Sequence, residues 1–219
     1  GVGDLLDEVT HKFPEDADTA EDNDEIKVAV IGKPNAGKSS LVNKILGEER
    51  VIVSNVAGTT RDAIDSHYEK DGDKFLFIDT AGMRKRGKID ENVERYSVVR
   101  SLAAVDRSDV CVIMIDAEEG VTEQDTKVAG YAHEQGKACI FAVNKWDIVD
   151  KDNKTVKQFT DRIRETFAFM SYAKIVFISA KTGQRINKLL EEIKLVNEQH
   201  KRRITTGMLN DVINEATHK

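Results

Sequence analysis

The sequence predicts an α/β fold in which a six-stranded, mostly parallel sheet with one antiparallel edge strand lies between two layers of helices. Over residues 25–200, short apolar runs alternate with longer segments whose apolar residues recur every three or four positions. Such alternation of strands and helices is typical of a sheet covered by helices on both faces. The dipeptide Asp71-Gly72, between the second and third apolar runs, is a tight-hairpin signal, so this pair of strands should be antiparallel.

The expected strands are short runs rich in β-branched and aromatic residues, and they span 26–31, 63–70, 73–79, 109–116, 137–144 and 173–179. The expected helices span 38–46, 91–105, 122–135, 155–168 and 184–200. The first of these ends at Gly47. The last keeps helical spacing of its apolar residues Ile186, Leu189, Leu190, Ile193 and Val196.

Composition limits the classes of function. The chain has 219 residues, 40% of them hydrophobic, which is enough for a core. Its net charge of −6 gives no overall field that would hold nucleic acid, although a local basic patch is compatible with it. Cys111 and Cys139 each lie in an apolar run and are expected to be buried free thiols. No apolar run reaches the length of a membrane span and no signal peptide is present, so we expect a cytoplasmic protein without a membrane partner.

The two flanks differ from the middle of the chain. Residues 1–24 end in an acidic stretch with almost no apolar residues, which reads as a solvated linker. Residues 25–200 form the expected domain. Residues 201–219 open with three basic residues and continue into a short amphipathic helix over 204–216, with one apolar face made by Leu209, Val212, Ile213 and Ala216. The chain begins with Gly1 rather than Met, so we expect an excised or processed chain.

Residues 32–39 match the pattern G-x-x-x-x-G-K-[ST]. Gly32 and Gly37 allow a tight backbone turn whose N–H groups point at phosphate oxygens. Lys38 would bring a positive charge to the β- and γ-phosphates, and Ser39 a hydroxyl to Mg²⁺. A strand precedes the motif and a helix follows it, so phosphate would sit at a helix N-terminus. The sequence therefore predicts a P-loop nucleotide-binding domain.

Two further segments carry chemistry at expected strand ends. Asp79 follows the third strand and can hold Mg²⁺ through water, and Gly82 can present its N–H to the γ-phosphate. Read alone, this segment is an ordinary strand end. Gly58–Asp62 holds Thr60, which can reach the metal and the γ-phosphate only when a third phosphate is present. Read alone, it is equally a turn with Thr caps.

Asn144-Lys145-Trp146-Asp147 follows the fifth strand. The Asp147 carboxylate can accept hydrogen bonds from guanine N1–H and the 2-amino group, and against adenine it would stay unpaired, a difference on the order of several kcal/mol. The Lys145 stem can lie along the base, and Asn144 can tie this loop to the P-loop. Trp146 is expected to be a packing residue. Ser179-Ala180-Lys181 ends the next strand, where a backbone N–H could meet guanine O6.

These segments together resemble the five G boxes of the TRAFAC GTPases, in the right order over residues 25–200. Pro34-Asn35 and the stretch 56–62 resemble the Era/TrmE-like branch. Residues 79–88 and 93–97 are most similar to the second G domain of the Der (EngA) family, whose members carry two tandem G domains and a KH-like domain and serve assembly of the large ribosomal subunit. Gly1–Val9 is similar to the last helix of a preceding G domain, and 202–219 to the start of the KH-like domain.

The resemblance implies a set of functional residues. Catalysis would fall to Lys38, Thr60, Gly82 and Asn35, and Mg²⁺ would be held by Ser39, Thr60 and Asp79. Guanine nucleotide, as GTP or GDP, would be bound by Gly32, Asn35, Ala36, Gly37, Lys38, Ser39, Ser40, Asp79, Asn144, Lys145, Asp147, Ser179, Ala180 and Lys181. Met83 stands where Ras-like proteins have a water-orienting Gln. In cation-dependent relatives a P-loop Asn helps bind K⁺, which implies a K⁺ site at Asn35, Ser54, Val56 and Thr59.

The resemblance implies a GTP-hydrolysing switch that works with ribosomal RNA or the large ribosomal subunit and with neighbouring G and KH-like domains. The alternative is a nucleotide-dependent binding module with negligible hydrolysis of its own, since the Gln is missing. An ATP-using enzyme is disfavoured by Asp147. The basic run 84–88 is read equally as a partner contact or as a solvated loop.

Overall fold

The computed structural model describes residues 25–47, 65–80, 93–150, 152, 154–203 and 205–217. They form one six-stranded sheet in the order β2-β3-β1-β4-β5-β6. The strands are β1 Glu25–Ile31, β2 Ser66–Lys70, β3 Asp73–Phe77, β4 Val110–Asp116, β5 Ala138–Asn144 and β6 Lys174–Phe177. All neighbouring pairs are parallel except β2 and β3, which are antiparallel at the sheet edge. The fold class expected from the sequence is confirmed.

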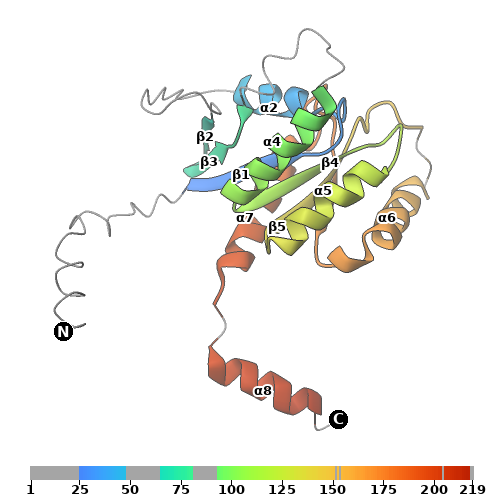
Figure 1. Ribbon diagram of the computed structural model, residues 1–219. Helices are drawn as coiled ribbons and strands as arrows, with labels where there is room; N and C mark the ends of the chain where they lie inside the picture. The colour runs from blue at the N-terminus through green and yellow to red at the C-terminus, as the bar shows by residue number, and fades with distance from the viewer. Residues whose placement is uncertain are drawn as a thin grey trace, which may run out of the picture.

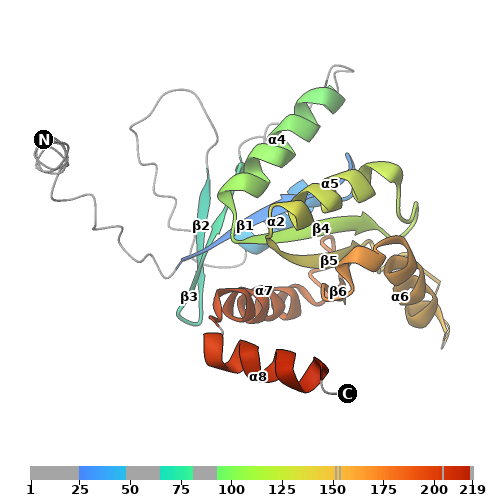
Figure 2. The ribbon, with the colours of Figure 1, turned by 60° about the horizontal axis from the view of Figure 1, so that its bottom comes forward.

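Of the α-helices that the structure describes, the first four lie between strands along the chain, and the last two follow the final strand (Figure 1). They are α2 Lys38–Gly47, α4 Val93–Arg107, α5 Glu123–Glu134, α6 Thr155–Thr166, α7 Ile186–Lys201 and α8 Thr206–Thr217, with a short 3₁₀ helix η2 at Ala168–Met170. Helices α2 and α7 pack on one face of the sheet, and α4, α5 and α6 pack on the other (Figure 2). Every residue of the central strands β4 and β5 is buried, as parallel strands between two helical layers must be.

The β2–β3 hairpin turns where the sequence indicated. Asp71 has φ 51° and Gly72 has φ 85°, so both central residues of the turn have positive φ, as in the turns that match the twist of a two-residue hairpin. Strand β3 ends at Phe77, two residues earlier than expected, because Asp79 adopts φ 56° and leaves the extended conformation. Strand β6 likewise ends at Phe177 rather than at residue 179.

Both cysteines are buried free thiols, as expected. They lie opposite each other on β4 and β5, at the paired positions Cys111 and Cys139. Within the residues that the structure describes, no helix is long and apolar enough to cross a membrane.

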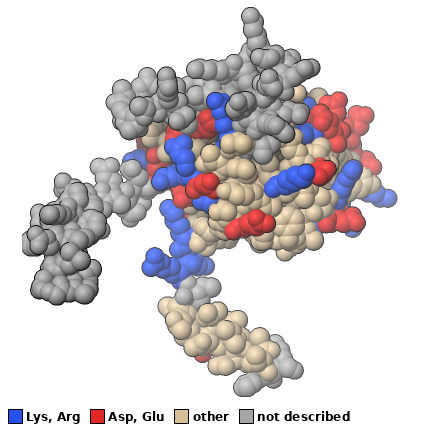
Figure 3. Space-filling model, in the orientation of Figure 1, with Lys and Arg blue, Asp and Glu red and all other residues tan. Residues whose placement is uncertain are grey.

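Helix α8 is the counterpart of the amphipathic helix expected over 204–216. None of its described residues is buried, and Met208, Leu209, Val212 and Ile213 are 49–64% exposed. The basic residues Lys201, Arg202 and Arg203 are exposed and lie at the end of α7 and in the segment that leads to α8 (Figure 3). The expected linker over residues 1–24 lies outside the described residues.

Candidate functional site

The loop between β1 and α2 has the backbone that its glycines permit. Gly32 has φ 137° and Gly37 has φ 96°, a region that side chains disfavour. A Cβ atom on Gly32 would lie 2.5 Å from the carbonyl oxygen of Met114, and one on Gly37 would lie 2.1 Å from Asn144 Nδ2. Both positions therefore require glycine, for the conformation and for the close approach of β4 and β5. Asn35, at the exposed tip of the loop, has φ 63°.

The loop leads into the first turn of α2, which starts at Lys38. Lys38 Nζ donates to the carbonyl oxygens of Gly32 at 2.6 Å and Lys33 at 2.5 Å, so its ammonium lies over the concave side of the loop. Ser39 is half-buried and Ser40 is exposed. A helix N-terminus carries N–H groups and a partial positive charge, which together favour an anion such as phosphate. The geometry fits a phosphate-binding loop.

Asn144, the last residue of β5, joins three segments of the site. Its Nδ2 donates to the Ala36 carbonyl oxygen at 2.9 Å, and its Oδ1 accepts from the Ala180 N–H at 2.9 Å. Both bonds are buried, and Asn144 itself is only 3% exposed. The P-loop, the 144–147 loop and the 179–181 loop are thus held together by one side chain, including the link to the P-loop that we expected from the sequence.

The residues after Asn144 are fixed by packing and by backbone contacts. The Trp146 N–H donates to the Ile178 carbonyl oxygen at 3.0 Å. The Trp146 ring is buried and packs against Phe159 and Phe177, with ring centroids 5.2 and 4.4 Å apart. Trp146 is therefore a packing residue, as expected. Asp147, next along the chain, is half-buried.

The 179–181 loop is closed on itself. Ser179 is fully buried, and its Oγ accepts the Thr182 N–H at 3.1 Å. Its carbonyl oxygen accepts the Gly183 N–H at 2.9 Å. Ala180 is buried and its N–H donates to Asn144, whereas Lys181 is exposed.

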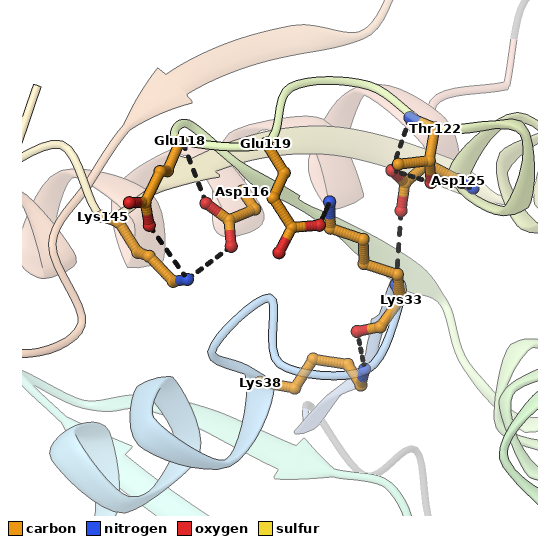
Figure 4. Close-up of polar contacts among 8 residues, drawn as sticks. All are labelled: Lys33, Lys38, Asp116, Glu118, Glu119, Thr122, Asp125 and Lys145. Carbon is orange, nitrogen blue, oxygen red and sulfur yellow. Dashed lines mark hydrogen bonds and ion pairs between the residues drawn. The ribbon is translucent and has the colours of Figure 1, made fainter. Parts of the chain in front are cut away.

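Lys145 is held by an acidic neighbour on β4 (Figure 4). Its Nζ lies 2.5 Å from Asp116 Oδ2 and 3.9 Å from Glu118 Oε2. Asp116 is fully buried, and burial alone would raise the pKa of its carboxyl group. The hydrogen bond and charge of Lys145, with backbone N–H groups, outweigh that effect and lower the pKa of Asp116. The hydrogen bond to Asp116 correspondingly raises the pKa of Lys145.

A second lysine, Lys33 in the P-loop, is paired in the same way (Figure 4). Its side chain is 6% exposed, and Nζ lies 2.7 Å from Glu119 Oε2. Its backbone N–H donates to Asp125 Oδ1 at 3.3 Å. Asp125 also accepts from the N–H and hydroxyl of Thr122, the capping box that starts α5. The segment 116–125 thus contacts both the P-loop and the 144–147 loop.

Asp79 lies one residue past the buried Ile78, at the carboxyl end of β3. Its N–H donates to Asp65 Oδ1 at 2.9 Å, and the Asp65 carboxylate also pairs with Arg107 at the end of α4. The adjacent buried hydroxyls of Ser66 and Thr80 are 2.7 Å apart. These contacts fix the backbone of Asp79 against the start of β2.

The structure describes only some of the site residues that we expected from the sequence. The described residues include the P-loop, Asp79, the 144–147 loop and the 179–181 loop. Ser54, Val56, Thr59, Thr60, Gly82, Met83 and the run 84–88 lie outside them. Among the described residues, no group of three or more His, Cys, Asp or Glu residues could hold a metal ion. Reading the sequence missed Asp116, Glu119, Asp125 and Lys33, although the pattern Thr122-x-x-Asp125 before an apolar run was a readable capping box.

Comparison with known proteins agrees with this geometry. Residues 27–145 match the family described as "50S ribosome-binding GTPase", more than half of the chain. The chain belongs to this family. It is 63% identical over 216 residues to GTPase Der of Ruminiclostridium cellulolyticum and 61% identical over 216 residues to GTPase Der of Caldanaerobacter subterraneus. Each match covers 99% of this chain and 49% of the relative, so the chain spans about half the length of the curated relatives it matches.

Solved structures of GTPases have the same architecture as this family member. One is Era in complex with MgGDPNP and a piece of 16S ribosomal RNA, with a TM-score of 0.58 and 28% identity over 77% of this chain and 55% of that one. Another is the elongation factor SelB from Methanococcus maripaludis with a GTP analogue, with a TM-score of 0.60, 83% of this chain covered and 35% of that one. At 18% identity, the latter supports the fold alone.

Proposed function

We propose that this chain binds and hydrolyses GTP as one G domain of a longer protein that acts in assembly of the large ribosomal subunit. The observation that carries the proposal is the buried bridge made by Asn144, because it sets the P-loop beside the two loops that would contact the base. The family assignment and the Der relatives support it. The buried free thiols are typical of a reducing compartment, in keeping with a cytoplasmic protein.

In this proposal, the backbone N–H groups of residues 32–39 and Lys38 Nζ bind the phosphates. Asp147 accepts from the guanine edge, and the Ala180 region meets O6. Phosphate oxygens are charged and form stronger hydrogen bonds than the neutral carbonyls of Gly32 and Lys33, to which Lys38 now donates. Lys38 can therefore turn from those carbonyls to the β- and γ-phosphates.

Ser39 and Asp79 supply the hydroxyl and carboxylate oxygens that suit Mg²⁺, with Thr60 as the third residue. The hydrogen bond from the Asp79 N–H to Asp65 would fix the backbone from which the Asp79 carboxylate extends. Bound Mg²⁺ supplies charge neutralisation at the β- and γ-phosphate oxygens. Asn35, Ser54, Val56 and Thr59 would hold K⁺, which adds positive charge near the same oxygens. Gly82 would donate its N–H to the γ-phosphate, and backbone groups would orient the water.

The flanks would belong to neighbouring parts of the longer protein. We propose that residues 1–24 are the tail of a preceding G domain with an acidic linker, and that 201–219 begin a KH-like domain. The match to about half of each relative leaves room for both domains. Ribosomal RNA or the large subunit would be contacted through the intact protein, with the run 84–88 as one candidate contact.

The test is nucleotide binding followed by single-turnover hydrolysis on this chain. Fluorescent GDP and fluorescent GTP should bind to the chain. Unlabelled GTP should displace them, and unlabelled ATP should not. In Asp147→Asn, GTP affinity should fall and xanthosine nucleotide should bind instead, because the amide presents one donor where the carboxylate only accepts. Unchanged GTP affinity in that variant would contradict the assigned base recognition. Binding without measurable hydrolysis in either K⁺ or Na⁺ would favour the alternative of a nucleotide-dependent binding module. That alternative follows from Met83, which stands where Ras-like proteins have the water-orienting Gln.

A further inference from the structure

Asp116 is a buried carboxylate at the centre of the site that none of the nucleotide motifs includes. It is the last residue of β4 and pairs in register with Asn144 on β5. It is fully buried, so its charge requires partners. Oδ1 accepts the Glu118 N–H at 2.9 Å, and Oδ2 lies 2.5 Å from Lys145 Nζ.

Lys145 is fixed at both ends by these contacts. Its backbone has φ 62°, next to the bridging Asn144, and its ammonium is pinned to Asp116. A lysine side chain otherwise has among the largest rotamer entropies of any residue. The side chain is 31% exposed, so part of it remains accessible to a ligand (Figure 4). The four-carbon stem between the two fixed ends therefore presents an apolar surface of defined position.

We propose that Asp116 is a positioning residue that holds the Lys145 stem as a preformed platform for the face of a purine base. The inference rests on the proposed function, since the base is that of the bound nucleotide. A platform contributes to affinity through the ring face and does not read the ring edge, which is left to Asp147. Asp116 should thus add to the affinity for guanine and hypoxanthine nucleotides alike.

The variant Asp116→Asn tests the negative charge of Asp116 separately from its size and shape. Its amide oxygen can still accept the Glu118 N–H, so the turn after β4 keeps its hydrogen bond, while the ion pair to Lys145 is lost. Affinity for GDP and for IDP, which lacks the 2-amino group, should each fall by about tenfold, because the released Lys145 stem must lose its rotamer entropy again on binding. The GDP-to-IDP ratio should stay unchanged. Glu123→Gln, the same charge change in an exposed pair with Lys127, should shift neither affinity by more than about twofold.

A second measurement tests the clamp without nucleotide. Acetylation of individual lysines, followed by mass spectrometry, should label Lys145 at least about tenfold more slowly than Lys127, which is 73% exposed and pairs with an exposed Glu123. Asp116→Asn should remove most of this difference. If that variant does not fold, the comparison within the wild-type chain still decides, since equal labelling of the two lysines would overturn the clamp.

The outcomes separate the inference from the proposed function. Faster Lys145 labelling with unchanged nucleotide affinity in Asp116→Asn would overturn the platform and leave GTP binding in place. A changed GDP-to-IDP ratio would also overturn it, because Asp116 would then act on edge recognition. A wild-type chain that binds no guanine nucleotide would overturn both. Equal losses for GDP and IDP with faster labelling would support the platform.

Discussion

Removal of the Asn144 side chain should both destabilise the domain and separate the loops of the site. Asn144→Ala deletes two buried hydrogen bonds and leaves the Ala36 carbonyl and the Ala180 N–H without this partner. Each buried group left unsatisfied costs about 1–3 kcal/mol, so the two together should lower the free energy of unfolding by about 2–6 kcal/mol. The fall is large because both partner residues are buried, at 0% and 3% exposure, which restricts replacement by water.

The variant Asn144→Asp separates the contribution of the hydrogen bond to Ala36 from that of the hydrogen bond to Ala180. The carboxylate still accepts from the Ala180 N–H, but its second oxygen cannot donate to Ala36 and would face that carbonyl oxygen at a spacing near the present 2.9 Å. The 179–181 loop should stay attached while the P-loop is pushed away. Nucleotide affinity should therefore fall in both variants.

Urea unfolding at constant m-value measures the first effect, and titration with fluorescent GDP measures the second. Asn187→Ala is the matched control, because its exposed amide accepts a hydrogen bond from Lys70 and takes no part in the hydrogen bonds through which Asn144 joins the three segments. This variant should stay within about 0.5 kcal/mol of wild type. A free energy of unfolding for Asn144→Ala that is equally close to wild type would refute the reasoning.

Three further predictions concern cations, domain boundaries and pH. K⁺ should accelerate single-turnover GTP hydrolysis over Na⁺, and Asn35→Ala should remove the difference while much of the GTP binding remains; equal rates for wild type in the two salts would exclude the K⁺ role. Deletion of residues 1–24 and 203–219 should leave GTP affinity within about tenfold, or 1.4 kcal/mol, of the full chain, because the described part of the C-terminal flank, α8, buries none of its residues; a larger loss by titration would place the domain boundary elsewhere. Asp116 has a lowered pKa in the folded chain, so its contribution to stability is present above its unfolded pKa of about 3.9 and is lost as pH falls through the lower folded value. Urea unfolding below about pH 4 should therefore show a smaller loss of stability in Asp116→Asn than in wild type.

The sheet could be predicted from the sequence because its signals are local. Apolar runs such as Val110–Asp116 and Ala138–Asn144 are continuous, as strands buried on both faces must be, and Asp71-Gly72 marks the hairpin directly. The predicted ends of the strands were less accurate than the predicted strands themselves. The end of β3 depends on the positive φ of Asp79 and on its bond to Asp65, 14 residues away, which no local apolar pattern encodes.

In the candidate site, too, the residues that form local motifs could be predicted from the sequence, and the residues paired by long-range contacts could not. The motifs at 32–39 and 144–147 are readable because their chemistry lies within a few adjacent residues. The pairs Lys33–Glu119 and Lys33–Asp125 join residues 86 and 92 positions apart, and each partner alone resembles an ordinary solvated charge. Only the parallel register of β1, β4 and β5 brings them together.

That register explains why the segment after β4 can serve both loops. The carboxyl ends of parallel strands meet at one edge of the sheet, and β4 lies between β1, which leads into the P-loop, and β5, which leads into the 144–147 loop. Asp116 and Glu119 therefore reach one lysine from each neighbouring strand, Lys145 and Lys33. A segment at the edge of the sheet would have a neighbour on one side only. The central place of β4 thus makes its carboxyl end the position from which the P-loop and the 144–147 loop can be held in fixed relation, and substitutions there should affect both.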